Sequence, residues 1–177
     1  MLYKKCISYL ALVLVYFVCS ILTASELDRA SVSSNELTKF IWLEGSVGFV
    51  PDGDSFDLVL KNKTIIKIRL KGIDAPERGQ NFSSESRSAL LKKIRAESFR
   101  VRQEGVDTYG RVLGTLFIGK RNINQEMVRE GFAWAYVFKG RQVAYGEDEK
   151  LAREKKRGLW KQKNVQAPWD FRKQNRK

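Results

Sequence analysis

The chain has 177 residues, 43% of them hydrophobic, which suits one folded domain of ordinary size. Lysine and arginine total 33 against 20 acidic residues, and the net charge of +13 favours nucleic acid as a partner. The chain has no histidine, and both cysteines lie in an N-terminal apolar run. Histidine-dependent hydrolysis and a thiolate zinc site in the body are therefore excluded.

The chain begins with a segment typical of export. Lys4 and Lys5 precede an apolar run over residues 6–22, and small residues follow it. This pattern is typical of a secretory signal, and the run is also long enough to remain as a membrane anchor. We therefore expect a signal peptide or anchor helix over 1–24 and a linker over 25–40. The body would be exported: secreted, periplasmic or anchored to the membrane by the apolar run.

The body that follows shows the alternation of apolar and polar residues typical of strands. Five short strands are predicted at 42–50, 55–60, 64–70, 99–103 and 112–118. Glycines and an Asp-Gly turn separate the first strands.

Three helices are predicted among and after these strands. The first runs over 83–94 with Ser83 as its N-cap, and the others lie at 123–130 and 147–157. Gly131 and Gly158 are expected to end the second and third helices.

The order of these elements predicts an α+β fold that is mainly β. We expect a five-stranded OB-fold barrel with about three helices, formed by one domain over 41–161. A basic C-terminal tail over 162–177 is expected to be frayed.

Charged side chains cluster around the second and third predicted strands. Asp54 follows a turn, and Arg69, Asp74 and Glu77 lie at and just after the end of the third strand. Two hairpin-connected strands would carry them toward one place, where carboxylates and a guanidinium can hold a hard divalent cation beside a phosphate diester. Arg111 in a later loop supplies a second guanidinium. The pattern indicates a phosphodiester-cleaving enzyme.

Five short motifs follow one another in the body: Asp52-Gly53-Asp54, Arg69-Leu70 with Ile73-Asp74-Ala75-Pro76-Glu77, Asp107-x-Tyr109-Gly110-Arg111, Asn124-x-x-Met127-Val128-x-x-Gly131, and Arg157-Gly158-Leu159-Trp160. Together they resemble the staphylococcal nuclease (thermonuclease) family over about residues 42–160. The resemblance implies a calcium-dependent endonuclease that cuts DNA and RNA with little sequence preference and leaves 3′-phosphate ends.

The resemblance also implies a set of metal and water-binding positions. Asp54 and Asp74 would be direct carboxylate ligands of Ca²⁺, and the backbone carbonyl of Ala75 would be a further ligand. Glu77 would orient or deprotonate the attacking water, a role for which the chain offers no histidine.

The remaining positions implied by the resemblance contact the substrate. Arg69 and Arg111 would clamp the scissile phosphate with planar guanidinium groups. Tyr109 and Tyr136 would line the nucleotide pocket. DNA and RNA would be the substrates, no protein partner is implied, and we expect a monomer.

Three alternatives remain open from the sequence. The main one is a noncatalytic OB-fold module that binds nucleic acid, which would be expected to lack at least one of the charged residues named above. A restriction-type nuclease would use Asp148-Glu149-Lys150 on a buried strand. A cationic protein of the membrane surface would follow from the N-terminal segment and the net charge.

Overall fold

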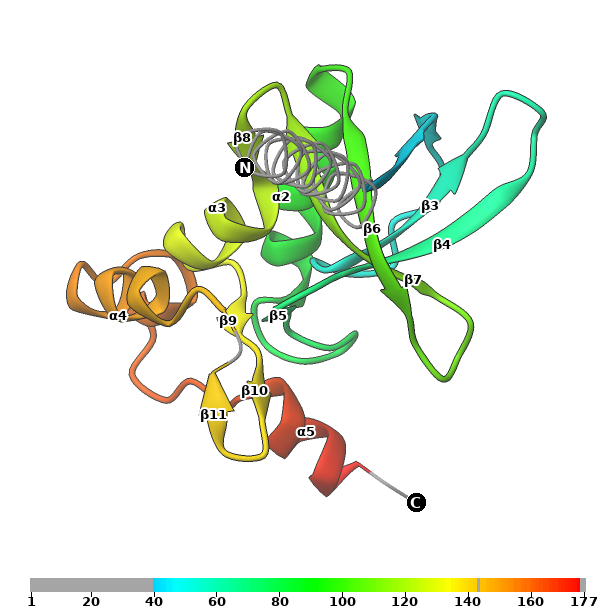
Figure 1. Cartoon of the computed structure of the whole chain (residues 1–177). Coiled ribbons are helices and arrows are strands. Elements are labelled where there is room, and N and C mark those ends of the chain that lie inside the picture. The colour runs from blue at the N-terminus through cyan, green and yellow to red at the C-terminus, as the bar shows by residue number, and fades with distance from the viewer. Residues whose placement is uncertain (1–39, 143, 176–177) are drawn as a thin grey trace, which may run out of the picture. The chain divides into compact units, whose positions relative to one another are not determined.

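The computed structural model describes residues 40–142 and 144–175 (Figure 1). The signal or anchor predicted over 1–24 lies outside the described residues, as does nearly all of the predicted linker. Among the residues that are described, no helix combines the length and the apolar character needed to cross a membrane.

The main sheet contains most of the strands of the body (Figure 1). Its strands lie in the order β1-β6-β7-β4-β3-β2, and β8 pairs with β7. Strands β4 and β7 are parallel, whereas the other pairs of this sheet are antiparallel. The strands span Ile41–Glu44 (β1), Ser46–Val47 (β2), Ser55–Val59 (β3), Ile65–Leu70 (β4), Arg100–Val106 (β6), Val112–Ile118 (β7) and Arg121–Asn122 (β8).

The predicted α+β class is confirmed, but the predicted closed barrel is not. Within the described body, no strand pairing closes the main sheet on itself. The strand predicted over 42–50 is instead divided into β1 and β2, which pair with β6 and β3 and are separated by Gly45 alone. A Cβ atom at Gly45 would lie 2.4 Å from the carbonyl oxygen of Val59, so only glycine fits at this position.

Two small two-stranded sheets lie beside the main sheet. Strand β5 (Ile73–Asp74) pairs with β9 (Trp134–Ala135), and β10 (Val137–Phe138) pairs with β11 (Arg141–Gln142). The pairing of β5 with β9 brings the segment after the third predicted strand next to the C-terminal half of the body.

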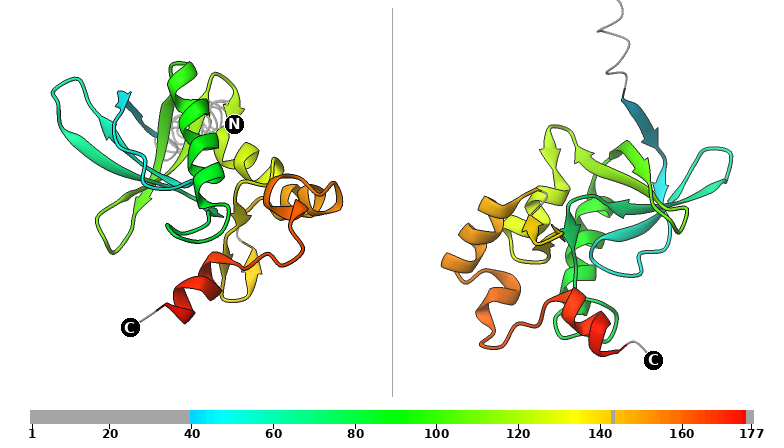
Figure 2. Two further views of the ribbon diagram at one scale, coloured as in Figure 1. Left: turned by 180° about the vertical axis from the view of Figure 1, so that it is seen from behind. Right: turned by 60° about the horizontal axis from the view of Figure 1, so that its bottom comes forward.

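The three predicted helices are present as α2 (Ser83–Ala96), α3 (Ile123–Arg129) and α4 (Gly146–Glu154). The predicted cap of the first helix is wrong, because Phe82 is the N-cap and no side chain caps this end. The view from behind in Figure 2 shows α2 along one side of the sheet, and α2 also contacts α3.

The tail is ordered as far as the structure describes it, so the prediction that it is frayed is wrong. A 3₁₀ helix, η1, spans Gly158–Lys161, and a further helix, α5, spans Pro168–Gln174. Pro168 is buried and stands at the start of α5, where the missing proline N–H costs no hydrogen bond.

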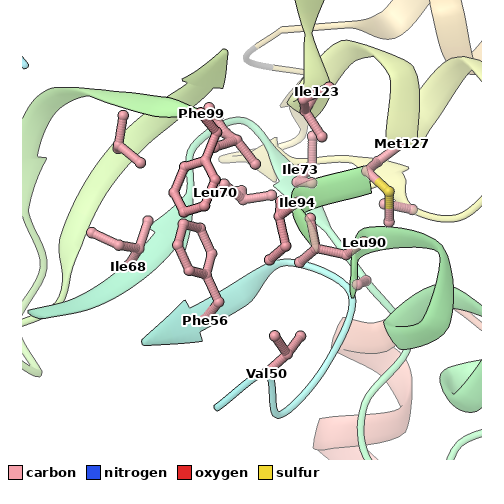
Figure 3. Close-up of a cluster of buried hydrophobic side chains, with 14 of the residues drawn as sticks. Val50, Phe56, Ile68, Leu70, Ile73, Leu90, Ile94, Phe99, Ile123 and Met127 are labelled. Atoms are coloured by element: carbon pink, nitrogen blue, oxygen red, sulfur yellow. The ribbon is translucent and has the colours of Figure 1, made fainter. Parts of the chain in front are cut away.

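The main hydrophobic core lies where β3 and β4 meet α2 and α3 (Figure 3). Phe56 and Phe99 meet edge to face, with their ring centroids 5.6 Å apart. Leu90 and Ile94 of α2 and Met127 of α3 are also buried in this core. Burial of each such side chain stabilises the fold by about 1.5–3 kcal/mol.

A second, smaller cluster of buried side chains holds the C-terminal elements together. Trp134 and Trp160 pack edge to face at 5.3 Å between centroids, with Ala152 and Leu159 beside them. Three partly buried side chains from other segments complete this cluster, namely Phe82, Val165 and Ala167.

The segments that follow α3 and α4 are joined through two glycines. Gly131 and Gly158 have φ angles of 77° and 52°, and the N–H of Leu159 donates to the Gly131 carbonyl at 2.9 Å. A Cβ at Gly131 would lie 2.3 Å from the carbonyl oxygen of Arg157. Both positions therefore require glycine. Gly131 follows the C-cap of α3, as predicted, but α4 ends at Glu154 with Lys155 as its C-cap. The prediction that Gly158 ends this helix is therefore wrong, and Gly158 instead begins η1.

Candidate active site

A pocket of about 740 Å³ gathers all the site residues that the sequence predicted: Asp54, Arg69, Asp74, Ala75, Glu77, Tyr109, Arg111 and Tyr136. The pocket is also lined by other side chains outside this predicted set, including Asp52, Asp107, Phe138 and Arg172. Residues from both halves of the chain therefore share one concave surface.

Two carboxylates lie at the bottom of this pocket. Asp54 stands directly before β3, Asp74 is the last residue of β5, and they are 5% and 1% exposed. The N–H of Ala75 donates to Oδ2 of Asp54 at 2.5 Å, and the Ser55 hydroxyl donates to Oδ1 at 3.0 Å. These hydrogen bonds fix the Asp54 carboxylate beside the turn that carries Asp74.

Gly53 allows the turn before β3 to pack closely on α2. A Cβ at this position would lie only 1.8 Å from Oγ of Ser86, which is itself buried and donates to the carbonyl of Phe132 at 2.7 Å. The absence of a side chain at Gly53 thus lets Asp54 lie in the buried part of the body.

Burial makes the charged forms of both carboxylates unfavourable. Burial raises the pKa of Asp54 to about 6, even though the Arg69 guanidinium lowers it. Burial likewise raises the pKa of Asp74, although the hydrogen bond from Arg172 opposes this effect. The bottom of the pocket therefore favours any cation that can reach these oxygens.

Arg69 lies between the two carboxylates. Its Nη2 is 3.3 Å from Oδ2 of Asp54 and 3.2 Å from Oδ1 of Asp74. Its Nη1 donates to the backbone carbonyls of Leu70 and Ile73, at 2.8 and 2.9 Å. With both terminal nitrogens engaged, the plane of this guanidinium is fixed.

Arg111 is positioned by Asp107 in the hairpin loop between β6 and β7. Oδ1 of Asp107 accepts the N–H groups of Tyr109 and Arg111, both at 2.9 Å, and Oδ2 accepts Nε–H of Arg111 at 2.8 Å. Burial alone would raise the pKa of Asp107, but the hydrogen bonds from Arg111 produce a net lowering. Asp107 therefore stays charged and orients the arginine, a role that the sequence analysis did not assign.

The parallel pairing of β4 with β7 brings the two arginines to one end of the sheet. Arg69 lies opposite Leu113, and Leu113 is two positions after Arg111 in the chain. This strand pairing could not be predicted from the sequence, because the residues of a strand do not indicate which other strand pairs with it.

The predicted aromatic residues lie at the rim of the pocket. Tyr109 is 83% exposed, and its ring lies 5.7 Å from the guanidinium carbon of Arg111. The N–H of Tyr136 donates to the Gly72 carbonyl at 2.9 Å, which holds this residue next to the acidic turn. Phe138 adds a further exposed ring.

Glu77 is bound by a residue that the sequence analysis missed. Nη1 of Arg172, on α5, donates to Oε1 of Glu77 at 2.5 Å and to Oδ1 of Asp74 at 3.1 Å. Nη2 of Arg172 donates to Oδ2 of Asp74 at 2.8 Å. The only sequence signal was the basic composition of the tail, which does not say where any one arginine points.

The pocket offers the oxygen donors that a hard cation prefers. Carboxylate and carbonyl oxygens of Asp54, Asp74 and Ala75 suit Ca²⁺ in kind, and neither histidine nor thiolate lines the pocket. Across the described residues, however, no three acidic or cysteine side chains are grouped as a metal site. Guanidinium groups of Arg69 and Arg172 engage the carboxylate oxygens instead.

The restriction-type alternative is wrong, because its acidic residues are structural. Asp148 and Glu149 lie on α4 and not on a strand. Oε2 of Glu149 accepts the N–H of Ala135 at 2.7 Å, and Oδ1 of Asp148 accepts Nε–H of Arg129, also at 2.7 Å. These contacts join α4 to β9 and α3, and neither acid lines the pocket.

Comparison with known proteins shows which family the chain belongs to. The family model described as "Staphylococcal nuclease homologue" matches residues 67–162. The chain is 40% identical over 139 residues to "Micrococcal nuclease" of Shigella flexneri, an alignment that covers 72% of this chain and 79% of the relative. It is 38% identical over 145 residues to "Protein ParB" of Escherichia coli, covering 75% and 81% of the two chains. It is 35% identical over 127 residues to an "Uncharacterized endonuclease" of Haemophilus influenzae, covering 72% and 71%. The chain belongs to the staphylococcal nuclease homologue family, and it is a nuclease.

Proposed function

We propose that the protein is an exported, calcium-dependent endonuclease that hydrolyses DNA and RNA with little sequence preference and leaves 3′-phosphate ends. The observation that carries the proposal is the position of Arg69, within 3.3 Å of the carboxylates of both Asp54 and Asp74, in a pocket that Glu77 and Arg111 also line. The export part rests on the sequence pattern of residues 1–24.

The acidic end of the pocket would hold the metal. Asp54, Asp74 and the carbonyl of Ala75 would be its protein ligands, and bound Ca²⁺ would neutralise charge on the nonbridging phosphate oxygens. Arg69 would bind the same phosphate from the side of the carboxylates. Because its guanidinium is already fixed, Arg69 would lose little conformational entropy when the substrate binds.

Hydrolysis requires a water to attack phosphorus in line with the oxygen that leaves. Glu77 would accept a proton from this water, since the pocket contains no histidine. The new P–O bond forms as the P–O5′ bond breaks, so the phosphate stays on the 3′ side and the 5′ oxygen takes up a proton. Arg111, held by Asp107, would stabilise the charge that develops in this step.

The rim of the pocket supports broad substrate use. Tyr109, Tyr136 and Phe138 offer aromatic faces, and stacking accepts any base. The net charge of +13 attracts the phosphate backbone regardless of sequence. The noncatalytic alternative receives no support, because it would be expected to lack at least one of the five charged residues that this pocket retains.

A nuclease assay on the purified protein tests the proposal. Single-stranded and duplex DNA and RNA would be incubated with calcium, magnesium or a calcium chelator, and the ends of the products identified by enzymatic labelling. We expect cleavage in calcium, 3′-phosphate products, and losses of about 100-fold or more for Arg69→Ala and Glu77→Ala. Lys92→Ala, an exposed substitution on α2 outside the pocket, serves as the control for lost positive charge. Full activity in chelator, or wild-type rates for Glu77→Ala, would contradict the proposal.

A further inference from the structure

We propose that the guanidinium of Arg172 occupies the calcium side of the active site when no metal is bound, and that Ca²⁺ must displace it. The inference rests on the calcium dependence proposed above. It assigns a function to α5, a helix that begins after the family match ends at residue 162.

The contacts of Arg172 fall on the groups assigned to the metal and the water. The guanidinium engages both carboxylate oxygens of Asp74, at 2.8 and 3.1 Å, and also Oε1 of Glu77. A paired fork of this kind is among the stronger hydrogen-bonded ion pairs. A metal ion coordinated by Asp74 would need the same lone pairs, so the metal and this guanidinium compete for one position.

The tail carries Arg172 to this position through specific contacts. The Gln80 side chain accepts the N–H of Glu77 at 2.9 Å and donates to the carbonyl of Gln166 at 2.7 Å. It is almost fully buried, so it links the acidic loop directly to the segment before α5. Figure 2, right, shows α5 next to the loop that follows β5. Arg172 therefore reaches the pocket as part of a docked segment.

The two arginines that bind the carboxylates differ in how firmly they are held. The side chain of Arg69 is 13% exposed and also donates to two backbone carbonyls. The side chain of Arg172 is 39% exposed, and within the described part of the chain its hydrogen bonds go only to the two acids. When calcium enters, Arg172 is the cation that leaves, whereas Arg69 stays in place to bind the phosphate.

Calcium binding without substrate gives the direct test. Wild type, Arg172→Ala and Lys173→Ala would be titrated with calcium by calorimetry, in full-length protein whose folding is checked by thermal unfolding. Lys173 is the next residue of α5, is exposed and does not line the pocket, so its variant matches the change in charge. We expect Arg172→Ala to bind calcium about three- to tenfold more tightly, and Lys173→Ala to match wild type.

Hydrogen exchange of the α5 amides gives a second readout. In wild type, calcium should speed exchange over residues 168–175, whereas in Arg172→Ala exchange should be fast with or without calcium. Equal calcium affinity in all three proteins overturns the inference and leaves the proposed function intact. Failure of every protein to bind calcium overturns the proposed calcium dependence, and the inference with it. Unchanged affinity with lower activity at saturating calcium would instead make Arg172 a substrate contact, which also overturns it.

Discussion

The backbone N–H of Ala75 donates to the carboxylate of Asp54, although the two residues are 21 positions apart. This hydrogen bond joins the turn before β3 to the residue after β5. It places the two carboxylates of the pocket beside each other and leaves Arg69 to bridge them.

Asp54→Asn should separate the stability of the pocket from its function. The amide oxygen can still accept from Ala75, and the substitution removes a charge that burial disfavours. We expect a melting temperature in chelator equal to or above that of wild type. Calcium affinity and nuclease activity should fall by about 100-fold or more, because a charged ligand is lost. A clear drop in melting temperature would mean that the ion pair with Arg69 outweighs the burial cost.

Asp107→Asn should loosen Arg111 without unfolding its loop. The side-chain oxygen of asparagine can still accept hydrogen bonds from the two backbone N–H groups. The amide NH₂, however, cannot accept a hydrogen bond from Nε–H of the arginine. We expect kcat to fall about tenfold or more with little change in KM for DNA. Steady-state kinetics of this variant beside Arg111→Ala would check it. A rate unchanged from wild type would show that Arg111 needs no orienting partner.

Gly53→Ala should destabilise the protein through a clash with Ser86. The added Cβ would meet a hydroxyl that is buried and hydrogen-bonded, which costs about 1–3 kcal/mol of unfolding free energy. Ser86→Ala alone should cost about 1 kcal/mol from its lost hydrogen bond. Urea unfolding of the double variant should show a smaller loss than the two single losses added together, since the clash is partly relieved. Strict additivity would contradict this packing.

Glu126 should make the fold sensitive to acid. The hydrogen bonds from Arg121, assisted by Lys93, lower its pKa to about 2 from 4.5. The unfolded chain therefore takes up the proton first as pH falls, so the stabilisation is complete above about pH 4.5 and is lost toward pH 2. Glu126→Gln should flatten the decline of unfolding free energy across this range. Glu85→Gln, an exposed substitution on α2, controls for the loss of one negative charge.

Local sequence patterns predicted most of the regular elements. The alternation over 55–60 and 64–70 corresponds to β3 and β4, whose register sets Ser55 opposite Arg69. That register is a property of one short hairpin, so the convergence of Asp54 and Arg69 could be foreseen. Gly131 could be foreseen for the same reason, since a left-handed residue after a helix is a local requirement.

Relations between distant segments could not be foreseen. The division of the first predicted strand at Gly45 depends on the carbonyl of Val59 across the sheet. The helix in the tail depends on Gln80 and on the small core cluster around Trp160. A run of lysines and arginines gives no sign of such contacts, so the sequence predicts for Arg172 only a place in a basic tail.

The ring centroids of Trp134 and Trp160 are 5.3 Å apart, and Val165 and Ala167, which precede α5, pack on the same cluster. Release of the tail would admit water to these rings, so their fluorescence emission should shift to longer wavelength without any attached dye. The protein thus contains its own optical reporter of whether the C-terminal segment is docked.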